Sequence, residues 1–161
     1  MIKPIIILAA LTLGLFAKGE FTETRYIYAL NKTTIINGSM SVNGDKTVVK
    51  YTSPIKKILT QQGNRLTIED LNAKTAQTVD LTKRMDMNLY FSFMRAVNNK
   101  DIESLNTHFN IAKNNKSYIL LPKGNVKKAI NKIEILTNKK SDMELMTIYF
   151  KNRDTIEIET L

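Results

Sequence analysis

The chain has 161 residues, a formal net charge of +9, one histidine and no cysteine. The lack of cysteine excludes disulfide bonds and thiolate metal sites, and the single histidine excludes a zinc site built on paired histidines. The charge comes mostly from scattered lysines, and aromatic residues are not interleaved with basic ones as stacking platforms for bases. The composition therefore does not favour nucleic-acid binding.

The N-terminus has the pattern of an export signal. Lys3 is followed by an uncharged run from Pro4 to Ala17, and the small residues Ala17 and Gly19 are spaced as a cleavage site requires. The run is too short for a comfortable membrane span. We predict a cleavable signal peptide over residues 1–19, with an uncleaved N-terminal anchor as the alternative.

Residues 20–161 have the size of one domain and are numerous enough to bury a core without covalent cross-links. In this part of the chain 22 cations stand against 15 acids, which leaves a charge of +7. We predict a single domain over residues 20–161 that needs no cofactor.

Short β-prone runs separated by turn signals fill the first half of this domain. The Asn43-Gly44 pair is typical of a tight hairpin, and runs joined so closely must be antiparallel neighbours. The predicted strands are Phe21–Tyr28, Ile35–Val42, Thr47–Thr52, Ile55–Gln61, Arg65–Asp70 and Thr75–Leu81.

The pattern then changes to a helical period. Apolar residues occupy most of the circumference of a helix predicted over Arg84–Asn98. Asp101 is a candidate N-cap for a short second helix over Ile102–Thr107.

Strand patterns resume after these helices. The predicted strands are Phe109–Lys113, Ser117–Leu121, Ile130–Thr137, Leu145–Lys151 and Thr155–Glu159. The fold class is therefore mainly β (α+β), with about ten or eleven antiparallel strands and a helical pair inserted after the sixth. A sheet this wide curls, and its concave face needs a cover. The apolar helix is the candidate lid.

Candidate catalytic residues are few. His108 has only Ser104, one turn earlier, as a local nucleophile, and a lone histidine at a helix end is more often a surface residue that interacts with the helix dipole. The sequence has no phosphate-binding loop, nucleophile elbow or calcium loop. We predict that the protein is not an enzyme and binds no metal.

Three of the seven methionines, Met85, Met87 and Met94, lie on the predicted lid. Methionine is flexible and polarisable, so it suits a surface that repacks around different apolar partners. The alternative is that these side chains simply fill a core. The two interpretations are compatible if the lid fills the concavity when it is empty and moves aside for an acyl chain.

Several short motifs resemble those of the LolA-like periplasmic carriers of outer-membrane lipoproteins. The resemblance covers nearly the whole exported chain. It rests on Phe21–Arg25, Gly38–Met40, Val48–Pro54, Leu59 with Gly63–Ile68, and Tyr118–Pro122. Further motifs, Val97–Asp101 with Leu105 and Phe109, and Arg153-Asp154, resemble a divergent branch of the family.

The resemblance implies an incomplete, strongly curved antiparallel β-barrel whose apolar cavity is closed by helices. It also implies a monomeric periplasmic carrier that shields lipoprotein acyl chains between an inner-membrane transporter and an outer-membrane acceptor. One element departs from the family pattern, because Val42–Lys46 has neither the arginine nor the proline of the element that latches the lid. The implied cargo therefore extends to lipids in general.

We predict that the cavity is lined by residues of both the sheet and the lid. They are Met40, Val49, Tyr51, Leu59 and Leu66 from the sheet and Met87, Leu89, Phe91 and Met94 from the lid. A register error of one residue would turn the sheet residues outward. The alternative function is that of a small periplasmic β-sheet protein that docks on an envelope complex and whose helix is only core.

Overall fold

A computed structural model describes residues 18–161. The predicted signal peptide, residues 1–19, lies outside the described residues except for Lys18 and Gly19, which open the first strand. Eleven strands make up one sheet. They are β1 (Lys18–Ile27), β2 (Lys32–Asn43), β3 (Lys46–Ser53), β4 (Lys57–Gln62), β5 (Arg65–Asp70), β6 (Thr75–Asp80), β7 (Phe109–Asn114), β8 (Ser117–Pro122), β9 (Ile130–Thr137), β10 (Met143–Phe150) and β11 (Thr155–Thr160).

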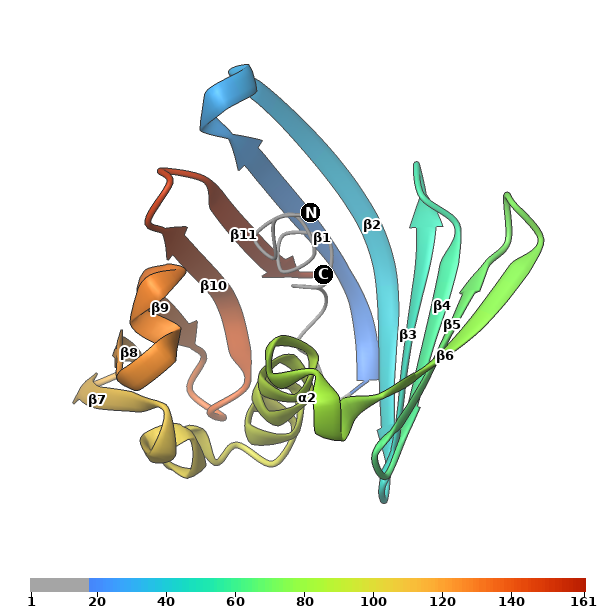
Figure 1. The fold of residues 1–161 in the computed structure, drawn as a ribbon. Coiled ribbons are helices and arrows are strands. Elements are labelled where there is room, and N and C mark those ends of the chain that lie inside the picture. The colour runs from blue at the N-terminus through green and yellow to red at the C-terminus, as the bar shows by residue number, and fades with distance from the viewer. Residues whose placement is uncertain (1–17) are drawn as a thin grey trace.

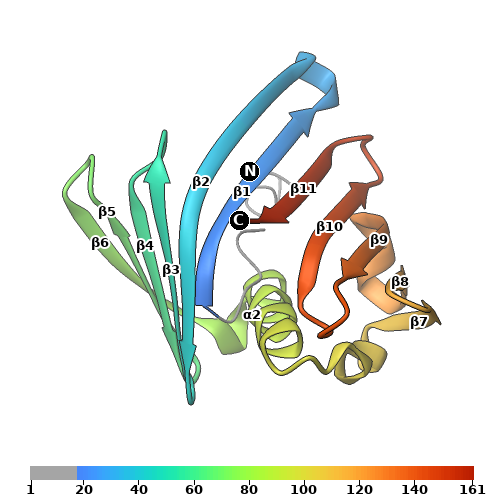
Figure 2. The same ribbon diagram turned by 180° about the vertical axis from the view of Figure 1, so that it is seen from behind.

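The strand order is β6-β5-β4-β3-β2-β1-β11-β10-β9-β8-β7, and neighbours are antiparallel throughout. Strands β1–β6 form an N-terminal wing and β7–β11 a C-terminal wing, and the pairing of β1 with β11 joins them. The outermost strands, β6 and β7, do not pair with each other, so the sheet is curved but not closed (Figures 1 and 2). The predicted incomplete antiparallel β-barrel is confirmed.

The helix α2 (Met85–Asn98) lies on the concave side of the sheet, between the two wings (Figure 1). The predicted second helix is a 3₁₀ helix, η3 (Ile102–Thr107), and the Asp101 side chain makes no capping hydrogen bond to it. Three more 3₁₀ helices are η1 (Tyr28–Leu30), η2 (Leu81–Lys83) and η4 (Gly124–Lys128). Within residues 18–161, no helix is long and apolar enough to cross a membrane.

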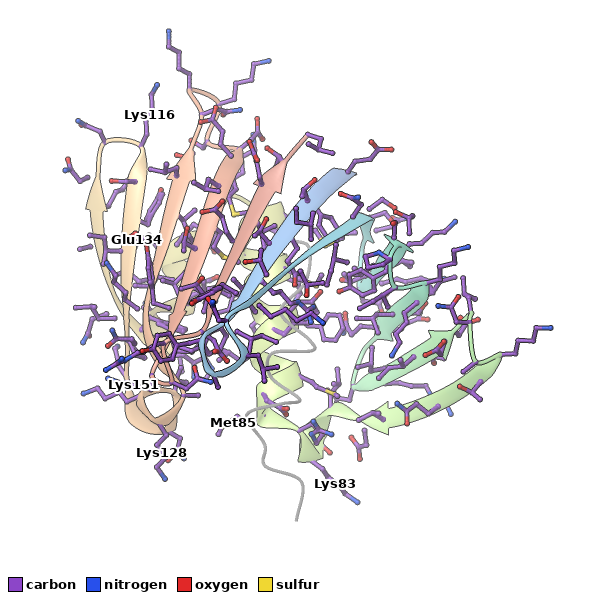
Figure 3. The ribbon with its side chains drawn as sticks, turned by 90° about the horizontal axis from the view of Figure 1, so that it is seen from above. Lys83, Met85, Lys116, Lys128, Glu134 and Lys151 are labelled. Atoms are coloured by element: carbon purple, nitrogen blue, oxygen red, sulfur yellow. The ribbon has the colours of Figure 1, made fainter. Side chains whose placement is uncertain are left out.

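The lysines illustrate how the charge is distributed. Lys83, Lys116, Lys128 and Lys151 are exposed and lie at the periphery of the molecule (Figure 3). The apolar residues gather instead in one core that includes both wings and α2. These lysines therefore keep their charge in water while the concave face stays mostly apolar.

Gly38 allows a close approach at the centre of the N-terminal wing. It lies opposite Phe21 on β1 and opposite Tyr51 on β3. The Phe21 ring meets the Tyr51 ring edge-on, with centroids 6.3 Å apart. A Cβ atom added at Gly38 would lie 2.5 Å from Phe21 Cζ and 2.8 Å from the Lys50 main-chain oxygen. A side chain at this position therefore does not fit without a shift of the sheet.

Replacing this glycine tests the close approach. We expect Gly38→Ala to lower the free energy of unfolding by about 1–3 kcal/mol, because the backbone oxygen of Lys50 cannot yield as a flexible side chain would. Urea denaturation followed by circular dichroism measures the loss. Ser39→Ala, at the neighbouring position on the opposite face, is the control and should stay within about 0.5 kcal/mol of the wild type. Equal free energies of unfolding for the two variants would show that the sheet accommodates a Cβ atom at position 38 without cost.

Candidate functional site

The nine residues predicted to line a cavity lie in one buried core, and none is more than 8% exposed. Five come from β2 to β5 and four from α2. They are Met40, Val49, Tyr51, Leu59 and Leu66 from the sheet and Met87, Leu89, Phe91 and Met94 from the helix. The structure therefore brings the predicted residues together. Their role in binding lipid stays a prediction.

The register of the sheet explains why these side chains share a face. Val49 lies opposite Met40 on one side and opposite Leu59 on the other, so the three form a row across β2, β3 and β4. Side chains directly opposite each other in an antiparallel sheet point to the same side. The row faces the core, as the alternation in the sequence predicts.

The sequence prediction left out the C-terminal wing, which supplies the other half of the concave face. Its buried side chains alternate with exposed or half-buried ones along each strand. They include Leu120, Ile133, Ile135, Met146, Ile148, Ile156 and Ile158. The sequence does carry a signal for this face. In β11, for example, the apolar residues Ile156 and Ile158 flank the charged Glu157, which is the alternation of a half-buried strand.

Glu23 is a buried carboxylate within this apolar face. It lies on β1 opposite Ile36 of β2 and Ile158 of β11, and its side chain is 0% exposed. Its Oε1 atom accepts a hydrogen bond from Arg25 Nε in an ion pair, whereas Oε2 has no hydrogen-bond partner in the described part of the chain. Burial raises the pKa of Glu23 to about 7, although Arg25 acts in the opposite direction.

Two tyrosines lie near this ion pair, one on the sheet and one on the lid. Burial raises the pKa of both Tyr51 and Tyr90 well above the usual range, and the Glu23 charge adds to the effect on each. Among residues 18–161 the buried Tyr51 hydroxyl makes no hydrogen bond, although the Tyr90 hydroxyl lies close enough to raise the pKa of Tyr51 further. Glu23, Arg25, Tyr51 and Tyr90 form a polar cluster where β1 and β3 face α2, and we call it the polar cluster below. Of these four residues, only Tyr51 is among those predicted from the sequence to line the cavity.

A second buried polar pair lies on the same wing. Thr47 and Gln61 are directly opposite each other on β3 and β4 and are 1% and 3% exposed. Gln61 Nε2 donates to the Gly63 main-chain oxygen at 2.6 Å, and Gln61 Oε1 has no hydrogen-bond partner within residues 18–161. The concave face therefore offers several hydrogen-bonding atoms within its apolar surface.

An apolar crevice of about 110 Å³ opens between the start of α2 and the C-terminal wing. Met85 and Leu89 line it from the helix, and Val126, Ala129 and Ile130 line it from η4 and β9. Met85 is 58% exposed at its mouth, whereas Leu89 belongs to the core. The crevice thus connects the surface with the end of the lid at which Met85 lies (Met85 is labelled in Figure 3).

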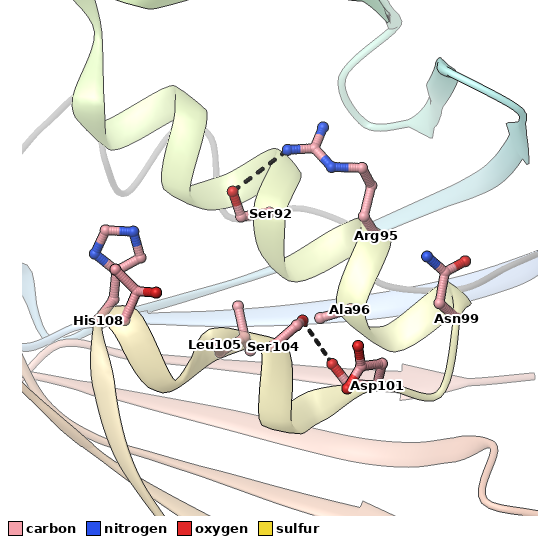
Figure 4. A pocket seen from close by; sticks show the side chains of 9 residues that line it. Ser92, Arg95, Ala96, Asn99, Asp101, Ser104, Leu105 and His108 are labelled. Atoms are coloured by element: carbon pink, nitrogen blue, oxygen red, sulfur yellow. Dashed lines mark hydrogen bonds between the residues drawn. The ribbon is translucent and has the colours of Figure 1, made fainter.

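A larger pocket, of about 370 Å³, lies at the other end of α2 and is lined mostly by polar residues (Figure 4). Ser104 Oγ donates to the Asp101 main-chain oxygen at 2.7 Å. His108 lines the same pocket, but within residues 18–161 no hydrogen bond joins its side chain to Ser104. The described residues also contain no group of three or more potential metal ligands.

Comparisons with known proteins add only a fold-level similarity. No family model and no curated protein matches the chain. One similar solved structure is a LolA superfamily protein from Nitrosomonas europaea, with 9% identity, a TM-score of 0.40, and coverage of 97% of this chain and 89% of that one. This is the family whose motifs the sequence resembles.

Two other similar structures contain lipoproteins. One is LppX from Mycobacterium tuberculosis, with 10% identity, a TM-score of 0.45 and coverage of 98% and 92%. The other is the CwlD amidase of Clostridioides difficile in complex with the GerS lipoprotein, with 14% identity, a TM-score of 0.46 and coverage of 85% and 79%. Identities and scores this low carry no argument about function, which rests on the geometry of the chain itself.

The raised pKa of Glu23 predicts a specific pH dependence of stability. The folded protein holds the Glu23 proton up to about pH 7, whereas the unfolded chain releases it near pH 4.5. The contribution of Glu23 to stability is therefore complete below pH 4.5 and is lost as the pH rises through 7. Between these values the wild type should lose about 3 kcal/mol relative to Glu23→Gln.

Denaturant titrations of the wild type and Glu23→Gln across this pH range measure the difference. Glu159→Gln, which removes an exposed carboxylate of β11, is the matched control and should follow the wild type. A difference between wild type and Glu23→Gln that does not change with pH would contradict the raised pKa.

Proposed function

We propose that the protein is a periplasmic carrier that shields the acyl chains of lipoproteins or other lipids between the curved sheet and the lid α2. One observation carries the proposal. A helix with eight buried residues among fourteen covers the concave, apolar face of a sheet that is not closed. An acyl chain can take the place of some apolar lid side chains on this face, because both bury apolar surface against the same strands.

The energetics of an acyl chain support this exchange. Each methylene taken out of water is worth about 0.8 kcal/mol, so a lipid chain needs a cover to cross an aqueous compartment. Two of the lid residues that face the sheet, Met87 and Met94, have flexible side chains that repack at low cost. We infer that an acyl chain takes the place of lid side chains against Met40, Val49 and Leu59.

The crevice beside Met85 and Leu89 is the inferred point of entry. It is apolar, it opens to solvent, and it lies where the lid meets η4 and β9. A chain that enters there reaches the interior with little displacement of the sheet. The inner-membrane transporter and the outer-membrane acceptor follow from the family resemblance, in which the carrier acts as a monomer.

A second candidate function is docking on an envelope complex, and one observation favours it. Ile119, Leu121 and Leu136 are each more than 40% exposed on β8 and β9. A shallow depression of about 200 Å³, lined in part by Ile119 and Leu136, lies beside them. Exposed apolar residues that gather on one face are typical of surfaces that bind another protein.

Uptake of a fluorescent lipid separates the two candidates. We expect the purified protein to bind an environment-sensitive fluorescent fatty acid, and Leu89→Asp to weaken this binding by about tenfold or more, because a charge in the crevice opposes the entry of an acyl chain. Leu89 is only 8% exposed, so Met85→Asp, at the 58% exposed mouth of the crevice, serves where Leu89→Asp does not fold and should weaken binding in the same direction. Fluorescence titration measures the affinity and circular dichroism checks the fold.

Ile119→Asp is the matched control, because it places the same charge on the outer face of β8. Its uptake should equal that of the wild type. The absence of uptake by the wild type across several acyl lengths would exclude the carrier. Loss of binding to a membrane-protein partner in Ile119→Asp, with lipid uptake absent in both proteins, would support the docking function.

The predicted export signal has its own test. Protein secreted into the periplasm of a bacterial host should begin at Glu20, because cleavage after Gly19 removes residues 1–19. Intact-mass spectrometry of the periplasmic fraction measures the new N-terminus. Recovery of the full-length mass in the membrane fraction would favour the uncleaved anchor.

A further inference from the structure

The polar cluster leaves hydrogen-bonding capacity unused inside the core. Glu23 Oε2 and Tyr51 Oη are both buried without a hydrogen-bond partner among the described residues. An unpaired buried polar atom costs free energy, and most native proteins pair or hydrate such atoms. The two residues lie on the same face in neighbouring rows, because Phe21, Gly38 and Tyr51 are opposite one another and Glu23 is two residues beyond Phe21 on β1. The two atoms on the face assigned to acyl chains therefore point to a ligand that completes their bonding.

The register places Glu23 at the junction of the two wings. Ile36, Glu23, Ile158 and Met146 lie in one row across β2, β1, β11 and β10, and Glu23 is the only ionisable residue among them. Arg25, two residues later on β1, points to the same side. An acyl chain lying along the concave face would thus pass or end beside a polar group.

We propose that Glu23, Arg25 and Tyr51 recognise the neutral, hydrogen-bond-donating head of the bound lipid, a hydroxyl or an amide N–H. The inference rests on the proposed carrier function and names the chemistry of its cargo. The donor of the lipid head bonds to Glu23 Oε2, and Tyr51 Oη donates to an oxygen of the same head. The acyl chain extends from there over Met40, Val49 and Leu59.

The charges in the cluster explain why the head is neutral. Arg25 already compensates the Glu23 carboxylate in an ion pair. An ammonium or carboxylate head would bring an extra charge into a site where Glu23 is fully buried and Arg25 is 14% exposed, and a buried charge without a partner is strongly unfavourable. A neutral donor completes the bonding of Oε2 without disturbing this balance.

The two unpaired atoms also favour lipid heads that carry a hydrogen-bond donor over ester heads, which carry none. An ester offers only acceptors, so it can bond to Tyr51 but leaves Glu23 Oε2 unpaired. A hydroxyl or an amide satisfies both atoms. Hydroxyls occur in partly acylated glycerolipids, and amide N–H groups occur in N-acylated lipids or proteins. A long-chain alcohol and a fatty amide, used as separate probes, distinguish these two sources.

The test compares a long-chain alcohol, the fatty amide and the methyl ester of the same chain length. Each displaces a fluorescent lipid from the purified protein at about pH 8.5, where Glu23 is ionised because its pKa is about 7. We expect the alcohol, the amide or both to bind about tenfold more tightly than the ester, as a hydrogen bond to a charged acceptor allows. Tighter binding of the alcohol would indicate a hydroxyl-bearing lipid, and tighter binding of the amide would indicate an N-acylated lipid or protein.

The double variant Glu23→Leu/Arg25→Met removes both members of the ion pair and so leaves no lone buried charge. It should bind all three probes within about twofold of one another, with the affinity for the ester unchanged. Tyr51→Phe keeps the ring against Phe21 and removes only the hydroxyl, so it serves if the double variant does not fold. It should weaken binding of each probe about threefold or more. Tyr149→Phe, whose hydroxyl bonds Glu134 at 2.9 Å, is its matched control.

Two outcomes overturn the inference. The first is equal binding of the ester, alcohol and amide by the wild type, which would leave the carrier function intact. The second is a donor preference that survives in the double variant or, where that variant does not fold, an affinity unchanged by Tyr51→Phe. Failure of the wild type to bind any probe would instead refute the carrier function and, with it, the recognition of a head group.

Discussion

The structure depends on the need to cover the concave face of a curved sheet that does not close. Buried apolar residues line both wings, and α2 is the only α-helix among residues 18–161 that could shield them from water. This constraint explains why the helix is apolar around most of its circumference rather than along one stripe. It also explains why a ligand can in principle replace the lid, since either one would shield the same apolar surface from water.

The polar cluster introduces a second requirement at the centre of that face. Glu23 and Arg25 form an ion pair on β1 next to the joint with β11, and Tyr90 of the lid lies close enough for the Glu23 charge to affect its pKa. A buried ion pair is often no more stable than an apolar replacement of the same shape. Stability alone therefore does not account for the pair, which agrees with the proposed recognition of a polar head group.

Local patterns in the sequence were sufficient for most of the fold. Turn residues such as Asn43 and Gly44 set the hairpins, and an alternation that is imperfect at Val48-Val49 was still enough to place Val49 and Tyr51 on the core side of β3. The joint between β1 and β11 was not predictable, because it pairs segments more than a hundred residues apart and depends on the closing geometry of both wings. Glu23 was missed for a related reason, since Thr22, Glu23 and Thr24 are all polar and their alternation shows only in the register.

The lid and the polar cluster together suggest how cargo could be both held and released. An acyl chain displaces apolar lid side chains from the same face, so the contacts that the lid loses offset part of the burial energy, and binding by the apolar face alone distinguishes poorly between lipids. Hydrogen bonds from a bound head group to Glu23 and Tyr51 would add binding free energy, because the empty protein does not make these bonds. In the proposed carrier, this added energy decides whether the lid stays against the sheet or gives way to a lipid.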